Sequence, residues 1–510
     1  MSKNPNRSFW LNTVNVNTYP SLNRDIKTDA LIVGGGLFGI TCAYLLSLEG
    51  VRTVLIEGNR LFNGVSGNTT AKITSQHGLI YDRLIRKYGE EKAQMYARSN
   101  EEAIQFITKT ASDHNIHCDL QTLPAYIYTE LDSSIEYIEK ETITAQKSGI
   151  NASLMKNLEL PLKIKAAVMF HNQAQFHPVK YMNELAVIFI NNGGRIFETT
   201  RALSLEQGKY HIVKTSGDNQ IKAKHVIIAT HFPFYDGLGL YFSRLYAERS
   251  YITAVAIKED FPRGMFLGAD DPALSFRSQS ASGNKLLLIG GENHKTGDGS
   301  SSIMHYANLI RKAKELYTVT SNPYQWSAQD YNTPDNIPYI GELTSGTTNI
   351  YVATGFKKWG MTTATLSAIM IRDLIIKGES PWTPLYNPSR FNLKASTVET
   401  YIKENFHVAK ELIKGKVRKT PEFKIIREGE AKEIEIEGKK YGGYKDSDGT
   451  LYILDITCTH LGCELKWNDA ERSWDCPCHG SRFNYDGSII EGPAHNPLKQ
   501  KNNEIQPNLK

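Results

Sequence analysis

Cysteine is scarce in this chain, with 6 residues in 510. So few cysteines cannot build the dense disulfide framework of a small secreted domain. Charge of one sign is also in short supply, because 59 Lys and Arg against 54 Asp and Glu leave a net charge of only +5. Such a small excess argues against a nucleic-acid surface. The composition, 40% hydrophobic and 22% charged, excludes a disordered or fibrous chain.

Targeting and membrane segments are also missing from the sequence. The start, MSKNPNRSFWLNT, is polar and has no apolar stretch before a cleavage site, unlike a secretory signal. The most apolar stretch, residues 30–48, is interrupted by Gly34, Gly35, Gly36 and Gly39 and therefore predicts a strand, a turn and a helix rather than a membrane span. We expect a cytoplasmic protein with no transmembrane segment and no nucleic-acid partner.

Three pieces follow one another along the chain. A large α/β part begins with a β-α-β pattern over residues 28–58 and ends near the prolines between Pro381 and Pro388. A helix is predicted over about 396–414, and from about 419 the pattern changes to short strands and turns. The helix has an apolar face that comprises Val398, Ile402, Phe406, Ala409 and Ile413, and we expect this face to pack on the large part. A helix that binds a partner protein is the alternative.

Four of the cysteines form two short segments with histidine near the C-terminus. The segments read C-T-H-L-G-C from Cys458 and C-P-C-H-G-S from Cys476. Each offers thiolates and one imidazole on a tight turn, which favours a metal site over scattered core cysteines. Structural zinc, which also takes four Cys or His ligands, is one interpretation. An iron–sulfur cluster is the other.

These two segments resemble those of the Rieske iron–sulfur family. The resemblance implies a [2Fe–2S] cluster whose four ligands are Cys458 and Cys476 on one iron and His460 and His479 on the other. Imidazole ligands raise the reduction potential from about −400 mV to roughly −150 to +300 mV. The resemblance also implies a disulfide between Cys463 and Cys478. Two free thiols are the alternative, because cytosolic disulfides are unusual.

Three neighbouring positions bear on the cluster. Ser481 matches a family serine whose hydroxyl bonds a cluster sulfide. Phe483 stands where the high-potential members carry a tyrosine, so one hydrogen bond to the cluster is missing. Gly492-Pro493 resembles the loop that covers the cluster, and a surface turn is the other interpretation.

Near the N-terminus, a glycine pattern follows a predicted strand and opens a helix. Gly34, Gly36 and Gly39 have G-x-G-x-x-G spacing, and Glu57 ends the next strand. Glycines at these positions allow a tight turn, close approach of a pyrophosphate and close packing of helix on strand, while the acid takes a ribose hydroxyl. The pattern predicts a dinucleotide site. A glycine turn without a ligand is the alternative.

The order of later segments resembles the FAD-dependent amine and amino-acid oxidoreductases of the D-amino-acid oxidase and sarcosine oxidase group. The resemblance covers about residues 28–380, is weak between about 90 and 170, and includes the glycine segment before the helix at Gly360. It implies bound FAD. The implied FAD contacts are Gly34, Gly36, Leu37, Phe38, Gly39, Glu57, Ser66, Asn68, Thr70, Ala71, Ala202, Ala229, Thr230, Gly355, Gly360 and Met361.

The whole chain resembles bacterial FAD-dependent oxidoreductases with a fused Rieske domain. This implies an α/β fold, a Rossmann-like FAD-binding domain with an inserted mixed-sheet substrate domain, plus a small all-β Rieske domain. The predicted boundaries are residues 1–385 for the oxidoreductase domain, with the substrate subdomain at about 85–190 and 245–330, residues 386–418 for the linker and residues 419–510 for the Rieske domain.

Catalytic residues are the least determined part of the sequence. Hydride transfer to a flavin needs mainly position and electrostatics from the protein. Arg277 is a candidate to hold a substrate carboxylate, His294 to take a proton, and Tyr251 to contact the substrate. Each also has a purely structural interpretation. Further candidates with the same two interpretations are Arg249, Lys295 and Lys72, whereas Cys42 and Cys118 are expected to be buried core thiols.

The resulting hypothesis is a dehydrogenase that oxidises a small amine or amino-acid-like substrate at FAD and passes electrons through the Rieske cluster to an external acceptor, or in reverse from a donor. The alternatives are a flavin oxidase that uses O2 beside a structural Rieske domain, and a non-enzymatic redox sensor. An oxygenase component would need a mononuclear iron site, and the sequence contains no D-x-x-H-x-x-x-x-H segment.

The hydrogen bond missing at Phe483 predicts a cluster potential below that of the quinol-oxidising Rieske proteins, because hydrogen bonds to the cluster raise its potential. A redox titration followed by electron paramagnetic resonance measures it. A potential as high as that of those proteins would contradict the prediction.

Overall fold

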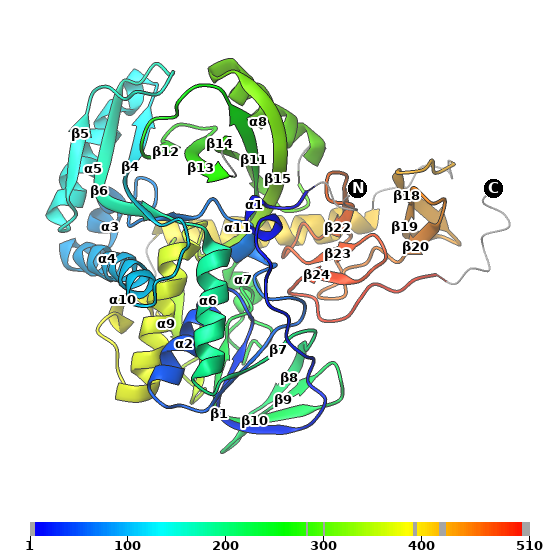
Figure 1. Ribbon diagram of the computed structural model, residues 1–510. Helices are drawn as coiled ribbons and strands as arrows, with labels where there is room; N and C mark the ends of the chain where they lie inside the picture. The colour runs from blue at the N-terminus through cyan, green and yellow to red at the C-terminus, as the bar shows by residue number, and fades with distance from the viewer. Residues whose placement is uncertain (1–5, 282–283, 299–300, 391–394, 418–424, 502–510) are drawn as a thin grey trace.

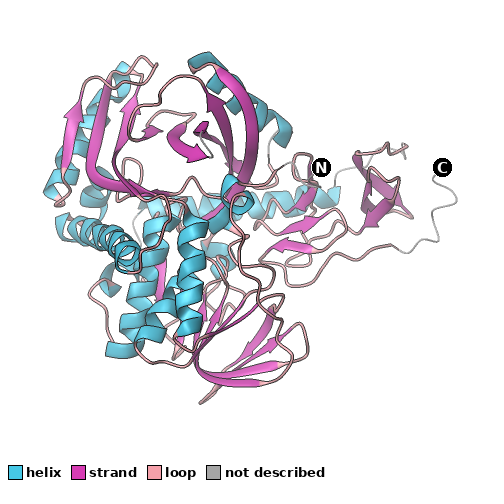
Figure 2. Ribbon diagram, viewed as in Figure 1, coloured by secondary structure: helices cyan, strands magenta, loops and turns pink. Residues whose placement is uncertain are grey.

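The computed structural model describes residues 6–281, 284–298, 301–390, 395–417 and 425–501. Figures 1 and 2 show a large half of two sheets with flanking helices and a smaller lobe, rich in strands, formed by the C-terminal part of the chain. The predicted class, mixed α/β with a separate small all-β region, is confirmed. Among these residues no helix is both long and apolar enough to cross a membrane.

The first sheet contains the predicted β-α-β unit. Its path is β16 (Tyr339–Glu342), β17 (Ile350–Thr354), β10 (Gln220–Ile228), β1 (Ile26–Val33), β2 (Thr53–Ile56) and β7 (Arg195–Phe197), with β9 (His211–Thr215) on β10 and β8 (Ala202–Glu206) on β9. Strand β1 pairs in parallel with both β2 and β10. The carboxyl ends of the central strands therefore meet at one edge, where doubly wound sheets bind ligands.

Three helices pack together on this half. They are α2 (Leu37–Leu48), α6 (Pro178–Asn191) and α9 (Gly360–Lys377), which lie side by side in Figure 1. Helix α6 falls inside the predicted substrate subdomain, yet it packs against α2.

The two remaining cysteines are buried, as expected. Cys42 lies in α2, whereas Cys118 lies in a loop before β4 (Gln121–Thr129) rather than on a helix.

The second sheet forms the other end of the large half. Its path is β15 (Val319–Asn332), β11 (Tyr246–Ile257), β14 (Asn284–Lys295), β13 (Ser275–Ala281), β12 (Met265–Gly268), β4, β6 (Ala166–Gln175) and β3 (Lys72–Ile73), with β5 (Ala152–Met155) on β6. The helices around it are α3 (Tyr81–Tyr88), α4 (Glu90–Asp113), α5 (Ile135–Lys147) and α8 (Ser302–Leu316). Shorter helices are α1 (Phe9–Asn12), α7 (Tyr241–Arg244) and α10 (Thr383–Tyr386).

The C-terminal lobe consists of two small antiparallel sheets. They are β18 (Ala431–Ile436), β19 (Lys439–Lys445) and β20 (Leu451–Leu454), and β21 (Lys466–Asn468), β22 (Ser473–Asp475), β23 (Arg482–Asn484) and β24 (Ile489–Glu491). Trp474, Leu465 and Phe483 are fully buried in its core. The predicted linker and lobe boundaries involve residues 391–394, 418–424 and 502–510, which lie outside the described residues, so these boundaries stay predictions.

Helix α11 (Ala395–Val417) joins the two parts, and the predicted packing face is wrong. Val398, Ile402, Phe406, Ala409 and Ile413 are all exposed, Phe406 to 71%. The helix is instead bound through another face, and its contacts are Glu404 to Lys295 at 2.6 Å, His407 to Asp298 at 2.8 Å, and Val408 and Leu412 against the lobe core. Lys295 and Asp298 on the large part attract charged residues of the helix, so the charged face of α11 makes the contact. The spacing of apolar residues alone cannot reveal this.

A buried ion pair joins the lobe to the second sheet, and further pairs within the lobe support it. Arg249 of β11 is 1% exposed, and its Nη2 lies 2.6 Å from Glu471 Oε1 of the lobe. Arg482 pairs with the other Glu471 oxygen and, through Nε at 3.0 Å, with Asp475 Oδ1. Burial alone would raise the pKa of Glu471, but Arg249 and Arg482 outweigh burial and lower the pKa to about 2.

Replacing Glu471 with Gln should weaken docking of the lobe by about 3–5 kcal/mol, because two buried guanidinium groups lose their shared carboxylate. The free energy of unfolding, from urea titration, measures this. Glu437→Gln, on an 84% exposed side chain paired with Lys501, is the control and should change stability by less than about 1 kcal/mol.

The same pair predicts a pH dependence. Since the folded pKa of Glu471 is depressed from 4.5 to about 2, its stabilisation is present above pH 4.5 and is lost as pH falls toward 2. The Gln variant should lack this loss. Equal acid sensitivity of wild type and variant would contradict the assignment.

Candidate functional site

The glycine turn between β1 and α2 has no room for side chains. Gly34 has φ +115°, and a Cβ there would lie 2.4 Å from the carbonyl oxygen of Ala229. A Cβ on Gly39 would lie 1.9 Å from the Gly34 oxygen. Helix α2 has Gly36 at its N-cap, and this glycine has no side chain to cap the helix. Ser66 accepts the first N–H, that of Leu37, and the start of the helix with its dipole lines a cavity. Such a helix start suits a phosphate.

Glu57 and Ser66 brace this turn. Glu57 follows β2, and its two carboxylate oxygens each accept a backbone N–H at 2.8 Å, from Gly35 and from Asn59. The Ser66 hydroxyl accepts from Leu37 N at 2.9 Å. A carboxylate has about four acceptor positions, so Glu57 retains capacity for a ligand hydroxyl.

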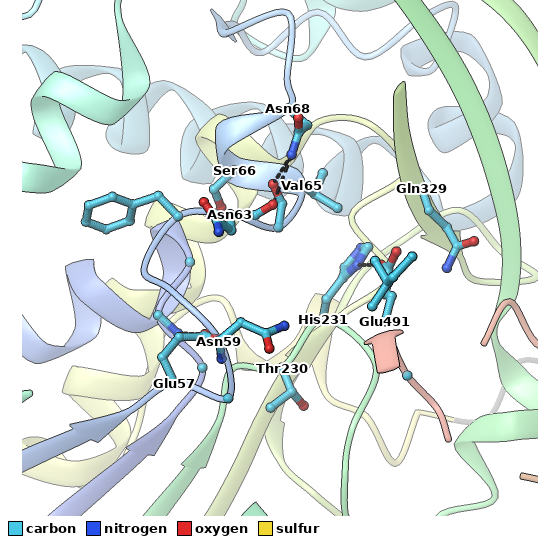
Figure 3. Close-up of a pocket in the computed structure, with 18 of the residues that line it drawn as sticks. Glu57, Asn59, Asn63, Val65, Ser66, Asn68, Thr230, His231, Gln329 and Glu491 are labelled. Atoms are coloured by element: carbon cyan, nitrogen blue, oxygen red, sulfur yellow. Dashed lines mark hydrogen bonds and ion pairs between the residues drawn. The ribbon is translucent and has the colours of Figure 1, made fainter. Parts of the chain in front are cut away.

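A cavity of about 1000 Å³ extends from this turn to the C-terminal lobe. Most of the predicted FAD contacts line it: Gly34, Gly36, Leu37, Phe38, Glu57, Ser66, Asn68, Ala202, Ala229, Thr230, Gly360 and Met361. Figure 3 shows Glu57, Ser66, Asn68 and Thr230 around it. The predicted contacts Gly39, Thr70, Ala71 and Gly355 lie outside the lining residues. At Gly355, with φ +77°, a Cβ would meet Thr333 at 2.5 Å.

The C-terminal lobe supplies part of the cavity wall, which the sequence analysis missed. Residues 488–495 of the lobe line the cavity together with Glu471, Arg482 and Asn484. Glu491 Oε1 lies 3.3 Å from Nδ1 of His231, directly after the predicted strand end at Thr230 (Figure 3). The position of His231 after a strand was a usable signal. Nothing in the sequence indicates that Glu491, 260 residues away, would meet it.

The cysteine and histidine segments come together beside this wall. Cys458 and Cys476 are buried, and hydrogen bonds from the Cys476 thiol and the Ser481 hydroxyl lower the pKa of Cys458. The rings of His460 and His479 lie 5.0 Å apart, and the Nδ1 atom of each is buried without a partner. Burial lowers the pKa of His460 to about 4 and of His479 to about 3, so both rings are neutral, the form that binds metals.

Cys463 and Cys478 form a disulfide, as the resemblance implies, so the alternative of two free thiols is wrong. The bridge links the two segments that carry the paired thiols and imidazoles. Gly492-Pro493 lies on the cavity wall, and the next residue, Ala494, donates its N–H to Ser481 Oγ at 3.0 Å. This loop therefore touches both the cavity and a cysteine–histidine segment.

The three predicted catalytic residues lie outside the cavity lining. The Tyr251 hydroxyl and His294 Nε2 are 3.0 Å apart, and both rings stack with His305. Arg277 is fully buried and donates to the carbonyl oxygens of Thr70 and Ala71 at 3.0 and 2.9 Å. A catalytic role for these residues stays a prediction that this geometry does not support. Arg277 instead holds the loop that precedes β3.

The other candidates also have structural partners. Arg249 and Lys295 connect the second sheet to the lobe and to α11. Lys72 donates to the carbonyl oxygen of Phe266 at 3.0 Å and to Ser275, and burial lowers its pKa to about 7.

Comparison with known proteins identifies both parts. Residues 29–374 match the family described as FAD dependent oxidoreductase, and residues 414–502 match the Rieske [2Fe-2S] domain. The chain belongs to the FAD-dependent oxidoreductase family and carries a C-terminal Rieske domain. Its cofactors are FAD and a [2Fe–2S] cluster. This match excludes the structural zinc interpretation, which the donor set alone leaves open.

Relatives cover the chain to different extents. The Rieske 2Fe-2S iron-sulfur protein YhfW of Bacillus subtilis is 43% identical over 98% of each chain. Gamma-glutamylputrescine oxidoreductase of Escherichia coli is 23% identical over 70% of this chain and 85% of that protein. The crystal structure of glycine oxidase from Geobacillus kaustophilus shares the fold, with TM-score 0.62 and 17% identity over 72% of this chain and all of that one.

The residues present fit both groups. The start of α2 and the glycine turn can receive a diphosphate, and the cavity is large enough for an extended ligand. Two buried thiols and two neutral imidazoles with unpartnered Nδ1 atoms match a cluster with mixed sulfur and nitrogen ligands.

Replacing both Cys463 and Cys478 with Ala should destabilise the Rieske domain by about 3 kcal/mol, because the disulfide closes a loop of 15 residues. The urea concentration at which the cluster absorption disappears measures this. Cys118→Ala removes a buried thiol that forms no disulfide and is the control, with a smaller expected shift. Equal midpoints for the double variant and wild type would contradict the role of the bridge.

Proposed function

We propose that this protein is a dehydrogenase that oxidises a small amine or amino-acid-like substrate at FAD and passes the electrons through its Rieske cluster to an external one-electron acceptor. The observation that carries the proposal is the shared wall. Residues of the Rieske domain line the cavity that we assign to FAD, and the cluster-binding segments lie on the other side of the same loop.

Contacts between the two sites are short. The Tyr331 hydroxyl, at the end of β15, donates to the carbonyl oxygen of Gly492 at 3.0 Å and lies 3.4 Å from that of His479. The Phe232 ring, on the cavity wall, lies 6.3 Å from the ring of His460. Few residues therefore separate the cavity from the proposed cluster ligands, which favours transfer within one molecule.

Within this assignment, particular groups hold the flavin. The N-terminus of α2 would hold the diphosphate, Glu57 would bind the adenosine ribose, and Gly360 and Met361, at the start of α9, would contact the flavin ring system. Bound there, FAD would supply two-electron oxidation with one-electron release, and a cluster held by the cysteine–histidine segments would supply one-electron transfer. Oxidation of an amine to an imine removes two electrons and two protons, so each turnover delivers two electrons to the acceptor and two protons to solvent.

The direction of flow follows from the ligand set. Histidine ligands raise the potential of a Rieske cluster above that of four-thiolate clusters, so the cluster is suited to accept electrons from a reduced flavin. Covalent fusion makes the transfer independent of protein concentration. The names of the similar proteins, an oxidoreductase of gamma-glutamylputrescine and an oxidase of glycine, support an amine or amino-acid-like substrate. The acceptor's identity and the cytoplasmic location stay predictions.

Flash photoreduction of the flavin under anaerobic conditions should be followed by reoxidation of the flavin as the cluster is reduced, at a rate that does not change with protein concentration. Absorption and electron paramagnetic resonance report the two groups separately. The Cys476→Ser variant, which loses a proposed cluster ligand, is the control and should keep its flavin reduced. Absence of internal transfer in the wild-type protein would refute the proposal.

Turnover in air distinguishes a dehydrogenase from an oxidase. A dehydrogenase should produce little hydrogen peroxide relative to the reduction of an artificial one-electron acceptor. Stoichiometric peroxide would support an oxidase with a structural Rieske domain instead.

A further inference from the structure

The carboxylates that line the cavity differ in their partners. Glu57 accepts two backbone N–H groups, Glu471 pairs with two arginines, and Glu491 lies against His231. Asp330 also lines the cavity and is only 4% exposed. Among the residues that the structure describes, Asp330 has no ion-pair partner.

Asp330 sits at the end of the cavity assigned to the isoalloxazine. It lies near the end of β15, and its carboxylate accepts a hydrogen bond from the backbone of Lys358, in the turn between β17 and α9. Tyr331, the next residue, receives the backbone N–H of Lys357 at 3.2 Å. The strand is thereby fixed against the turn that leads to Gly360 and Met361.

Strand alternation separates Asp330 from the contacts with the Rieske domain. Ser327 bonds to Glu471 and Gln329 donates to the carbonyl oxygen of Gly480 at 2.8 Å, so these side chains face the Rieske domain. Successive side chains of a strand point to opposite faces, so Asp330 points the other way. Among the described residues no hydrogen bond or ion pair joins its carboxylate to the Rieske domain, although the charge of Glu491 acts on it.

Positive groups near Asp330 already have partners. The His231 ring and Lys358 are the basic groups that act on it, and they contact Glu491 at 3.3 Å and Glu248 at 3.7 Å. Burial raises the pKa of Asp330, which means that the buried carboxylate lacks full compensation for its charge.

Arginines that could hold a carboxylate are also occupied or distant. Arg60 pairs with Glu198 at 2.8 Å, and Arg482 with Glu471 and Asp475. Arg201 lies at the Glu57 end, where its guanidinium carbon would be 3.4 Å from a Cβ on Gly58. Of the other lining residues described, Arg7 is exposed to solvent.

We propose that Asp330 binds the ammonium group of the substrate. The protein would then select its substrates by the positive charge of their amine, and not mainly by binding a carboxylate group of the substrate. This inference rests on the proposed function and names the substrate class for the same site. A cation gains a charge-assisted hydrogen bond to a carboxylate in a site of low dielectric, whereas an anion meets like charge.

Anaerobic titration of the oxidised holoenzyme tests the proposal without turnover. The probes are methylammonium, butylammonium, putrescine and tetramethylammonium, with acetate as the anion, and the readout is the perturbation of the flavin spectrum. At least one cation should bind more tightly than acetate, and Asp330→Asn should weaken that binding at least about tenfold. Asp330→Glu, which keeps the charge, should retain part of the affinity.

Asp298→Asn removes a carboxylate outside the cavity lining and should leave cation binding unchanged. FAD content and circular dichroism establish that each variant is folded. The inference is overturned if no cation binds, if acetate binds more tightly than every cation, or if Asp330→Asn leaves the affinity unchanged.

Flash photoreduction of Asp330→Asn separates this inference from the proposed function. Internal electron transfer at the wild-type rate with weakened cation binding supports the anchor. Loss of both would show that Asp330 maintains the flavin site, and overturns it. Cation binding through Asp330 in a wild-type protein without internal transfer would refute the electron-transfer proposal and leave the anchor standing.

Discussion

The docking of the Rieske domain against strand β15 is the contact on which the arrangement of both sites depends. One face of the strand end holds the domain through Ser327, Gln329 and the Tyr331 hydroxyl. The same strand carries Asp330 on its other face, beside the turn before α9. A change in the angle at which the Rieske domain docks would therefore move the proposed cluster ligands and the cavity wall together.

Burying four charged groups at this contact needs a physical reason. Desolvation makes buried ion pairs poor sources of net stability compared with apolar packing. The pairs among Arg249, Glu471, Arg482 and Asp475 have directional geometry, however, since each arginine meets a carboxylate oxygen at one defined place. An apolar contact would tolerate sliding of the domain by a residue or more. In an ionic contact, each buried charge that loses its partner costs desolvation energy, so only one orientation of the domain is favourable. A fixed orientation keeps the distance between the two cofactor sites constant, which the proposed electron transfer requires.

The local motifs could be predicted because their chemistry lies within a few residues. The spacing of Gly34 to Gly39 predicts a dinucleotide site, and the two cysteine–histidine segments predict a metal site. The choice of a [2Fe–2S] cluster over zinc came from the resemblance to the Rieske family. The disulfide between Cys463 and Cys478 came from family resemblance rather than from spacing. Contacts between remote segments, such as His231 with Glu491, could not be predicted, because nothing in either local sequence specifies the other.

Two side-chain arrangements differ from the simplest sequence interpretation, and they share a physical cause. The apolar face of α11 was expected to be buried, but the surface that receives the helix presents Lys295 and Asp298, so charged residues of the helix are selected instead. Arg277 was a candidate to hold a substrate carboxylate or to have a structural role, and it donates to the carbonyl oxygens of Thr70 and Ala71 in the loop before β3. A side chain's type limits the partners it can accept, while the fold decides which partner is present.

The use of arginine inside the fold also determines the charge that a substrate encounters. Arg249 and Arg277 are the strongest candidates in the sequence for binding a carboxylate, and both are fully buried with internal partners. Arg249 pairs with Glu471 of the Rieske domain, and Arg277 donates to the loop before β3. Because these cations are bound elsewhere, the carboxylate of Asp330 is, among the described residues, the charged group without an ion-pair partner at the end of the cavity where we propose that the flavin ring lies. In the proposed function, the fused Rieske domain would therefore influence the charge of the substrate as well as electron transfer, since Arg249, which docks the domain, is an arginine that is no longer available to a substrate.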